Sequence, residues 1–287
     1  MPTRDELRPL RALARLYTPE FQQPLFTLLC ELEAAVSESL RPGLDHQVAH
    51  VRLAWWREEF GRLARGEPAH PLTQAVAAQF RAHRLAPPAG LAGFVDTAIW
   101  DLASATCETR RELDAYCARW AAAMMTPLAL LATAREAAVG DLAAGVVQLG
   151  ATVHEVELLA NLAADARRGR VRLPLDELAL AQVPAEELAR LPWSPALAAL
   201  LRGRQQQLRR QLAAQASALP RAAQPLLRGV LVWAYLAAQL SRRCERALPR
   251  APGPRDHHRP LDAARAWQAA RRATQCRLRL SEEERVT

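Results

Sequence analysis

The fold of this chain is indicated most clearly by the stretch Leu149–Pro174, LGATVHEVELLANLAADARRGRVRLP. It begins as an apolar segment and ends in three arginines within four residues, followed by a closing proline. Four polar side chains stand at i, i+3, i+7 and i+11, which places them on one face of a helix predicted over residues 136–166: His154, Glu157, Asn161 and Asp165. Such a stripe either faces solvent or lines a polar cavity.

The spacing of this stripe resembles the second aspartate-rich region of the squalene/phytoene synthase family. In that region a Gln, an Asn and two Asp residues precede a G-R-x-Y-L-P ending, which reads GRVRLP here, with Arg172 in place of Tyr. The stripe keeps the register but changes the chemistry: His154 stands for Gln, Glu157 for Asn and Asn161 for the first Asp, and only Asp165 is kept. The resemblance implies an all-α, isoprenoid-synthase-like helical bundle around a central cavity.

The expected bundle forms one domain over residues 21–273, between an N-terminal helix with its lead-in at 1–20 and a charged tail at 274–287. Composition agrees, since 50% of the 287 residues are hydrophobic and only 12 are glycine, which favours helix and a sizeable core. Apolar periodicity, prolines and caps predict these helices: 5–16, 24–40, 45–65, 72–84, 92–102, 136–166, 196–219, 222–248 and 261–272.

Charge and cysteine usage restrict the partners and the compartment. All 38 basic residues are arginine and the net charge is +8, which favours contact with phosphates or anionic lipid. Aromatic residues do not interleave with the arginines, so we expect no nucleic-acid partner. The longest apolar run is shorter than the roughly 20 residues that span a bilayer, and the five cysteines show no paired spacing. We expect a cytoplasmic protein, with peripheral contact at the inner membrane as an alternative.

The first aspartate-rich region of the family, C-R-x-x-D-D-x-x-D, aligns with the helix predicted over 24–40. Cys30 matches its Cys, Glu31 takes the Arg position, Ala34 replaces the first metal-facing Asp, and Glu38 replaces the last. Magnesium needs several oxygen ligands and neutralises the leaving diphosphate. The resemblance therefore implies a weak clamp, with Glu38 and Asp165 as the remaining metal ligands. No cofactor is expected, and Mg²⁺ only if the protein is catalytically active.

A second resemblance points to one branch of the family, the phytoene-synthase-like assembly factor of respiratory complex I and its relatives. Its pieces occur here in order as Leu32-Glu33, Ser37-Glu38, Arg52–Arg57 and His70-Pro71. We expect at most one of Trp55 and Trp56 to face the core, because they are adjacent on a helix. A protein partner is therefore among the alternatives.

Further candidates follow from the family pattern. Tyr116 begins a segment that resembles the central Y-C-x-x-V-A-x-x-V-G motif and could touch substrate, as could Asp101, although a buried, satisfied core role suits both. Arg168 and Arg170 could hold a phosphate or lipid head near Asp165, or form a solvated basic turn. The His154–Glu157 pair could also bind a transition metal.

The leading hypothesis is a noncatalytic or weakly active family member that binds a prenyl diphosphate or other isoprenoid lipid, or acts in assembly. Its predicted substrate-binding residues are His154, Glu157, Asn161, Asp165, Arg168, Arg170 and Tyr116. One alternative is an active Mg²⁺-dependent head-to-head prenyl transferase that uses Glu38, Glu157 and Asp165. Another is a membrane-surface scaffold without ligand.

Overall fold

The computed structural model describes residues 8–41, 43–103, 106–253 and 258–280. Within these residues every regular element is helical. The helices are α1 (Arg8–Leu16), α2 (Gln23–Ser37), α3 (His46–Arg65), α4 (Pro71–Ala82), α5 (Gly93–Leu102), α6 (Arg110–Arg135), α7 (Ala143–Ala160), α8 (Leu162–Ala166), α9 (Leu175–Leu180), α10 (Pro195–Ala218), α11 (Arg228–Ala247) and α13 (Leu261–Thr274). The all-α expectation is confirmed.

Local sequence signals set several helix ends. The Asp45 side chain caps α3 by accepting the N–H groups of Gln47 and Val48 at 2.8 and 3.2 Å, a favoured use of Asp at this position. Gly66 ends α3 with φ +86°, a conformation that glycine adopts without a steric penalty. The helix predicted over residues 45–65 is therefore found almost unchanged.

The helix predicted over residues 136–166 is wrong as a continuous element. A short 3-10 turn occupies Ala137–Val139, α7 begins only at Ala143, and α7 and α8 are separated at Asn161. Gly140 has φ +71°, which is incompatible with continuing a right-handed helix. The polar stripe is therefore divided between two helices.

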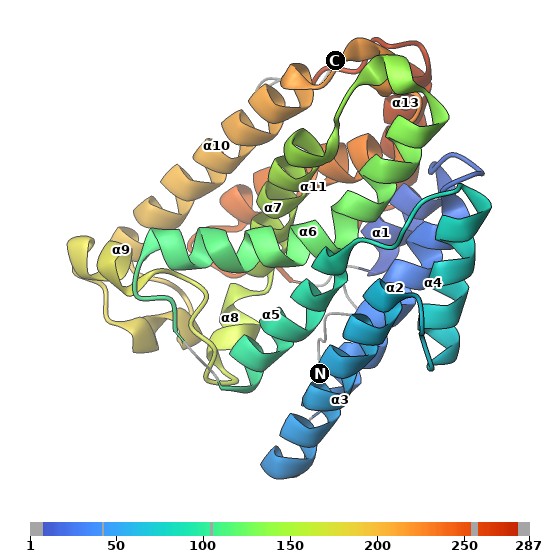
Figure 1. Cartoon of the computed structure of the whole chain (residues 1–287). Coiled ribbons are helices and arrows are strands. Elements are labelled where there is room, and N and C mark those ends of the chain that lie inside the picture. Colours follow the sequence, from blue (N-terminus) through green and yellow to red (C-terminus); the bar gives the residue numbers. More distant parts are fainter. Residues whose placement is uncertain (1–7, 42, 104–105, 254–257, 281–287) are drawn as a thin grey trace.

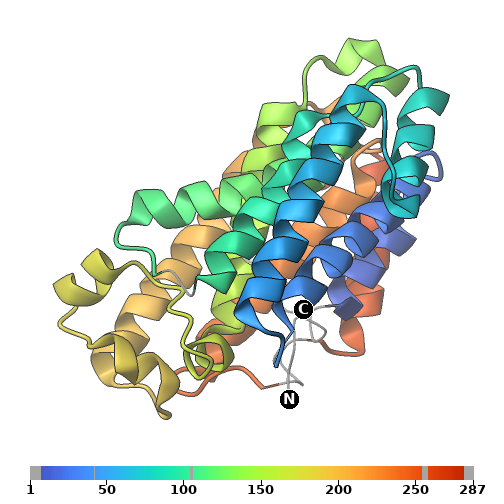
Figure 2. The ribbon, with the colours of Figure 1, turned by 60° about the horizontal axis from the view of Figure 1, so that its bottom comes forward.

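The long helices pack side by side in one bundle (Figure 2). In its centre α6 packs along α7, and α7 packs against α10 and α11, while α11 also contacts α1 and α13 (Figure 1). A Cβ built on Gly150 of α7 would lie 2.4 Å from Met125 Cγ of α6. Only glycine permits this close approach of the two central helices.

Large aromatic side chains fill the core where these helices meet. Trp120, Trp233 and Tyr116 are among the largest fully buried side chains. By length and composition α6 could cross a membrane, but 61% of its most apolar window is buried inside the protein. This burial is typical of the core helix of a globular domain. The central cavity itself stays a prediction.

The two segments that were expected to flank the domain both contact it. In α1, Leu10 and Ala14 are buried. After α13 the chain is held at Leu278, whose N–H donates to Gln224 Oε1 and whose carbonyl accepts from Gln224 Nε2, both at 3.0 Å. The described part of the predicted charged tail is therefore docked on the bundle, while residues 281–287 lie outside the described residues.

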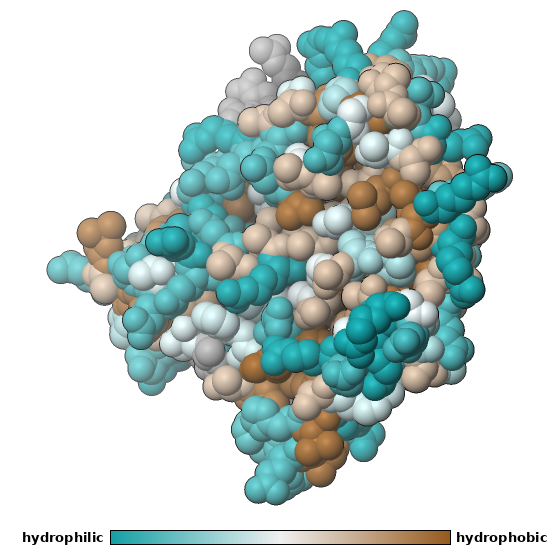
Figure 3. Space-filling model, in the orientation of Figure 1, coloured by the Kyte–Doolittle hydropathy of each residue, from teal (hydrophilic) through white to brown (hydrophobic). Residues whose placement is uncertain are grey.

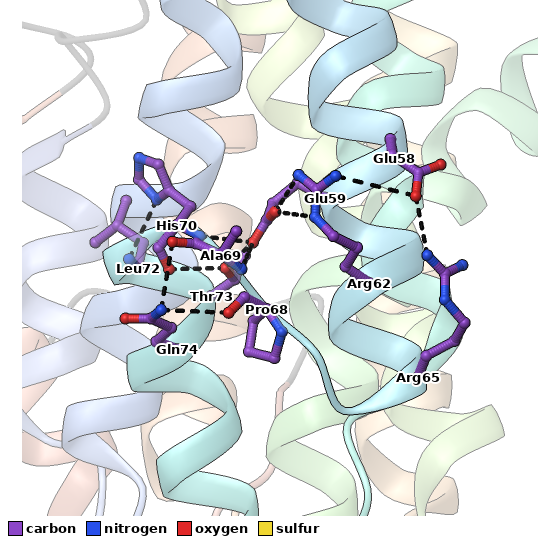
Figure 4. A network of polar contacts seen from close by, with 10 residues as sticks. All are labelled: Glu58, Glu59, Arg62, Arg65, Pro68, Ala69, His70, Leu72, Thr73 and Gln74. Carbon is purple, nitrogen blue, oxygen red and sulfur yellow. Dashed lines mark hydrogen bonds and ion pairs between the residues drawn. The ribbon is translucent and has the colours of Figure 1, made fainter.

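The tryptophan pair of α3 behaves as expected. Trp56 is 5% exposed and Trp55 is 44% exposed. One turn further on, the buried carboxylate of Glu59 accepts the N–H groups of Ala69 and His70 at 2.9 and 2.8 Å and the Thr73 hydroxyl (Figure 4). Burial would raise the pKa of Glu59, but these bonds lower it. Glu59 thus holds the α3–α4 turn in place.

Candidate functional site

Among the described residues, two buried polar clusters contain predicted site residues, and each is built around one arginine. The Arg11 cluster draws on α1, α2, α6, α7 and α11, and its members are Arg11, Glu33, Trp120, His154, Glu157 and Trp233. The Arg172 cluster joins α5, α6, α8 and the segment after α8, and its members are Asp101, Tyr116, Asp165 and Arg172. Residues from almost the full length of the chain are needed to form them.

In the Arg11 cluster, one guanidinium bridges two carboxylates. Arg11 Nη1 lies 2.5 Å from Glu33 Oε2, and Arg11 Nη2 lies 2.6 Å from Glu157 Oε2. Both glutamates are buried, at 6% and 3% exposure. A buried carboxylate requires a charged partner or several donors to offset the loss of solvation. Arg11 meets this requirement for Glu33 of α2 and Glu157 of α7 together.

The two buried tryptophans donate further hydrogen bonds to these carboxylates. Trp120 Nε1 donates to Glu33 Oε1 at 2.8 Å, and Trp233 Nε1 donates to Glu157 Oε1 at 2.9 Å. The Arg11 guanidinium lies 5.2 Å from the centroid of each indole ring, within the range of cation–π attraction. Both carboxylates therefore accept hydrogen bonds from Arg11 and from a tryptophan, and the guanidinium also lies against two aromatic rings.

The electrostatics of the cluster favour the charged forms of its central pair. Burial would raise the pKa of Glu157, but the attraction of Arg11, the nearby His154 and the hydrogen bonds from Arg11 outweigh it and lower the pKa to about 2. Burial would lower the pKa of Arg11, but Glu157 and Glu33 raise it above its usual range. Glu157 is thus held as a carboxylate at neutral pH.

His154 connects the two clusters. Its ring stacks on Trp120 at 4.0 Å between centroids with a 7° interplanar angle, and on Tyr116 at 5.9 Å and 20°. Its Nδ1 lies 3.9 Å from Glu157 Oε2. The imidazole is therefore sandwiched between aromatic rings at 2% exposure, in contact with the residue that pairs with Arg11.

In the Arg172 cluster, a guanidinium again lies between two carboxylates. Arg172 Nη2 is 2.6 Å from Asp101 Oδ1, and Arg172 Nε is 3.6 Å from Asp165 Oδ2. The Tyr116 hydroxyl donates to Asp101 Oδ1 at 3.0 Å, and Arg172 lies over the Tyr116 ring at 5.1 Å. Burial would lower the pKa of Arg172, but Tyr116, Asp101 and Asp165 raise it.

The other predicted site residues lie apart from these clusters. Glu38 is exposed on the 3-10 turn that follows α2, and Arg168 is exposed after α8. The Asn161 amide donates to the backbone carbonyl of Glu157 at 3.1 Å, and so satisfies a carbonyl group in the last turn of α7. Arg170 is half-buried and donates its backbone N–H to the Asp165 carbonyl at 2.9 Å. The structure brings together Tyr116, His154, Glu157 and Asp165 from the predicted set.

This arrangement does not fit a magnesium clamp. Mg²⁺ demands an octahedral set of oxygen ligands, whereas Glu157 and Asp165 are each paired with a guanidinium. Across the residues that the structure describes, no three or more His, Cys, Asp or Glu side chains are grouped so that they could hold a metal ion. The metal role of Glu38 and Asp165 stays a prediction.

Sequence reasoning missed five members of the clusters: Arg11, Glu33, Trp120, Arg172 and Trp233. Glu33 precedes Ala34, the position aligned with the first metal-facing Asp, but it is Glu33 that points inward while Ala34 is exposed. The available signal was its place beside the apolar Leu29, Leu32 and Val36, which share the buried face of α2. Arg11 gave no local signal, because its partners are distant in sequence.

Comparison with known proteins supports the same family. The family model described as squalene/phytoene synthase matches residues 8–265. A dehydrosqualene synthase in complex with ligand has a similar structure, with a TM-score of 0.74 at 13% identity over 94% of this chain and 96% of that one. Squalene synthase HpnC from Alicyclobacillus acidocaldarius has a TM-score of 0.63 at 16% identity, over 84% of this chain and 94% of its own. Comparison with curated proteins found no match. The chain belongs to the squalene/phytoene synthase family.

Proposed function

We propose that this protein is a noncatalytic or weakly active member of its family that binds an isoprenoid without efficient magnesium-dependent condensation. The observation that carries this proposal is the position of Arg172. Its guanidinium lies between Asp101 and Asp165, and Asp165 is the one acidic residue that the family-like stripe retains. The carboxylate best suited to a metal is therefore engaged with an internal cation.

The chemistry of prenyl transfer explains why this pairing matters. Ionisation of an allylic diphosphate becomes fast only when metals and cations meet the charge that develops on the leaving group. In each cluster two carboxylates face one arginine, so neither arginine has surplus charge to offer a diphosphate. The loss of one electrostatic stabiliser commonly costs about 10²-fold in rate, and losses within one cluster do not add independently.

Binding of the isoprenoid chain is supported by the apolar character of the interior. Trp120, Trp233 and Phe26 form edge-to-face contacts with ring centroids 5.8 Å apart, next to the Arg11 cluster. Aromatic surfaces of this kind stabilise apolar ligands in buried sites. We propose a prenyl diphosphate or another isoprenoid lipid as the ligand class.

A turnover assay tests the proposal. The purified protein is incubated with farnesyl and geranylgeranyl diphosphate in the presence of Mg²⁺, and the lipid extract is analysed by mass spectrometry. We expect the substrates to be recovered largely unchanged, and a bound isoprenoid to copurify with the native protein. Clear condensation that Asp165→Ala abolishes would show instead that the protein is an active transferase.

A contact function is favoured by a separate observation on α3. Val48, Val51 and Trp55 are exposed by 45%, 69% and 44% on one face, and hydrophobic atoms are visible at the projecting end of this helix (Figure 3). We propose that this face supports peripheral membrane contact or an assembly-type protein contact of a cytoplasmic protein. In a vesicle flotation assay with anionic lipid, Val51→Asp should weaken membrane binding if the face contacts lipid. If Val51→Asp floats with the vesicles as wild type does, the result would favour a protein contact at this face.

A further inference from the structure

The last described segment of the chain has a strongly uneven balance of charge. Residues 258–280 contain six arginines and a single acidic residue, Asp262. Asp262 is fully buried: its Oδ1 lies 2.8 Å from Arg243 Nη1 of α11, and its Oδ2 accepts the backbone N–H of Arg259 at 2.9 Å. The segment therefore turns its one negative charge into the bundle, and its exposed side is basic. The three glutamates at positions 282–284 lie outside the described residues.

Within this segment, α13 is amphipathic. Four alanines between positions 266 and 273 form its buried face, and the helix packs on α11 and α1 (Figure 1). On the solvent side Leu261 is 63% exposed and Trp267 is 54% exposed, and the Arg271 guanidinium lies 5.6 Å from the centroid of the Trp267 ring. A helix that exposes leucine, tryptophan and arginine together is typical of segments that lie in the interface of a membrane.

The end of α1 extends this exposed side. One guanidinium, that of Arg228, donates to the Tyr17 carbonyl at 2.7 Å and to Thr274 Oγ1 at 3.3 Å, so the chain that follows α1 lies close to the end of α13. Immediately before Tyr17, Leu16 is 63% exposed and Arg15 is also exposed. A further leucine and a further arginine are therefore available near the end of α13.

We propose that Arg15, Leu16, Leu261, Trp267 and Arg271, together the α13 surface, bind an anionic lipid bilayer. The arginines attract negatively charged head groups, and each contributes about a 5-fold gain in binding near such a surface. The Trp267 indole lies at head-group depth, where its apolar ring and its N–H are both accommodated. Because Asp262 faces inward, the described part of α13 presents no carboxylate that would repel the lipid. The net charge of +8 adds long-range attraction.

The α13 surface is separate from the isoprenoid site and from the exposed face of α3. The proposal deepens, and to that extent rests on, the peripheral membrane contact proposed above, but none of its residues belongs to the Arg11 cluster, the Arg172 cluster or α3. A protein that retains an isoprenoid but does not float with vesicles would contradict only the membrane contact. A protein that floats with vesicles but holds no isoprenoid would contradict only the proposed ligand.

The test measures flotation of the full chain with vesicles of phosphatidylcholine alone and of an equimolar mixture of phosphatidylcholine and phosphatidylglycerol. We expect wild type to bind the anionic vesicles at least ~10-fold more strongly. Trp267→Ala and Arg271→Gln should each lower this binding by about 5-fold. The matched control Arg210→Gln removes an exposed arginine of α10 and should bind as wild type does. Since Trp267 and Arg271 are exposed, the thermal midpoints should stay close to that of wild type.

Several results would overturn the proposal. Equal losses in Arg210→Gln and Arg271→Gln would show that the vesicles respond only to the net charge of the protein. Wild-type binding in Trp267→Ala, or equal binding to both kinds of vesicle, would also contradict it. Arg271→Lys keeps the positive charge and should retain vesicle binding, so a loss as large as in Arg271→Gln would contradict electrostatic attraction. Binding of a labelled RNA oligonucleotide that falls in the same variants, without vesicle binding, would assign the surface to nucleic acid instead.

Discussion

Arg11 Nη2 lies 2.6 Å from Glu157 Oε2, although 146 positions separate the two residues in the chain. The contact joins the first described helix to the stretch that carries the family resemblance. Because both residues are largely withdrawn from water, the centre of the bundle is complete only when α1 has docked. The N-terminal segment is thus part of the site.

Replacing Arg172 by Met should strongly destabilise the protein. The substitution leaves Asp101 and Asp165 without their shared cation, and breaking a buried ion pair on one side typically costs roughly 3–5 kcal/mol. Urea denaturation of wild type and variant measures this loss as the difference in the free energy of unfolding. Arg170→Met in the same turn is the control, and its effect should stay within about 0.5 kcal/mol. Similar losses in both variants would refute the buried pairing.

Acid should remove the stabilisation that Glu157 provides. Its pKa is lowered from 4.5 to about 2 in the folded protein, so the unfolded state takes up the proton first as the pH falls. The contribution is present above about pH 4.5 and is lost as the pH falls toward 2. The stability difference between wild type and Glu157→Gln should shrink over this window. A difference that does not change with pH would contradict the pairing with Arg11.

Gly229→Ala should weaken the docking of α1. The added methyl would overlap Thr18 Oγ1, and overpacking of this kind typically costs about 1–3 kcal/mol. Gly203→Ala is the matched control, because no atom lies within 4 Å of its Cβ in α10, and it should stabilise the helix by up to ~1 kcal/mol. Thermal denaturation measures the stability change of both variants. We expect Gly229→Ala to lower the stability and Gly203→Ala to raise it, and equal changes would contradict the close approach of α1 and α11.

The adjacent tryptophans of α3 should differ in their contribution to stability. Trp56→Ala removes a side chain that is 5% exposed, and should cost roughly 3–5 kcal/mol. Trp55→Ala should cost about 1 kcal/mol or less, because Trp55 is 44% exposed and loses mainly contacts with Trp56, His70 and Arg62. Chemical denaturation measures the free energy of unfolding of both variants. A larger loss of stability in Trp55→Ala than in Trp56→Ala would contradict the assignment of Trp56 to the core.

Local signals predicted much of the fold. Asp45 and Gly66 bound α3 as helix caps normally do, and the spacing of Trp55 and Trp56 indicated that they face different surroundings. The family motifs, from the Trp pair to GRVRLP, indicated the bundle that the family match and the solved structures support. These features depend on neighbours within a few turns of helix.

The site could be predicted only in part. The stripe from His154 to Asp165 assumed one continuous helix, but Asn161 turns the backbone between α7 and α8. Arg11 and Trp233 lie near opposite ends of the chain, and nothing in either segment indicates that both contact Glu157. Contacts of this range depend on how the helices pack, which periodicity alone does not determine.

Anomalous diffraction at the manganese edge tests the central claim most directly. Crystals of the wild-type protein would be soaked with Mn²⁺ and a nonhydrolysable farnesyl diphosphate analogue. We predict no manganese peak between α2 and α7, with the Arg11 guanidinium still between Glu33 and Glu157. A metal cluster bound by Glu157 and Asp165, with Arg11 and Arg172 displaced, would contradict this account.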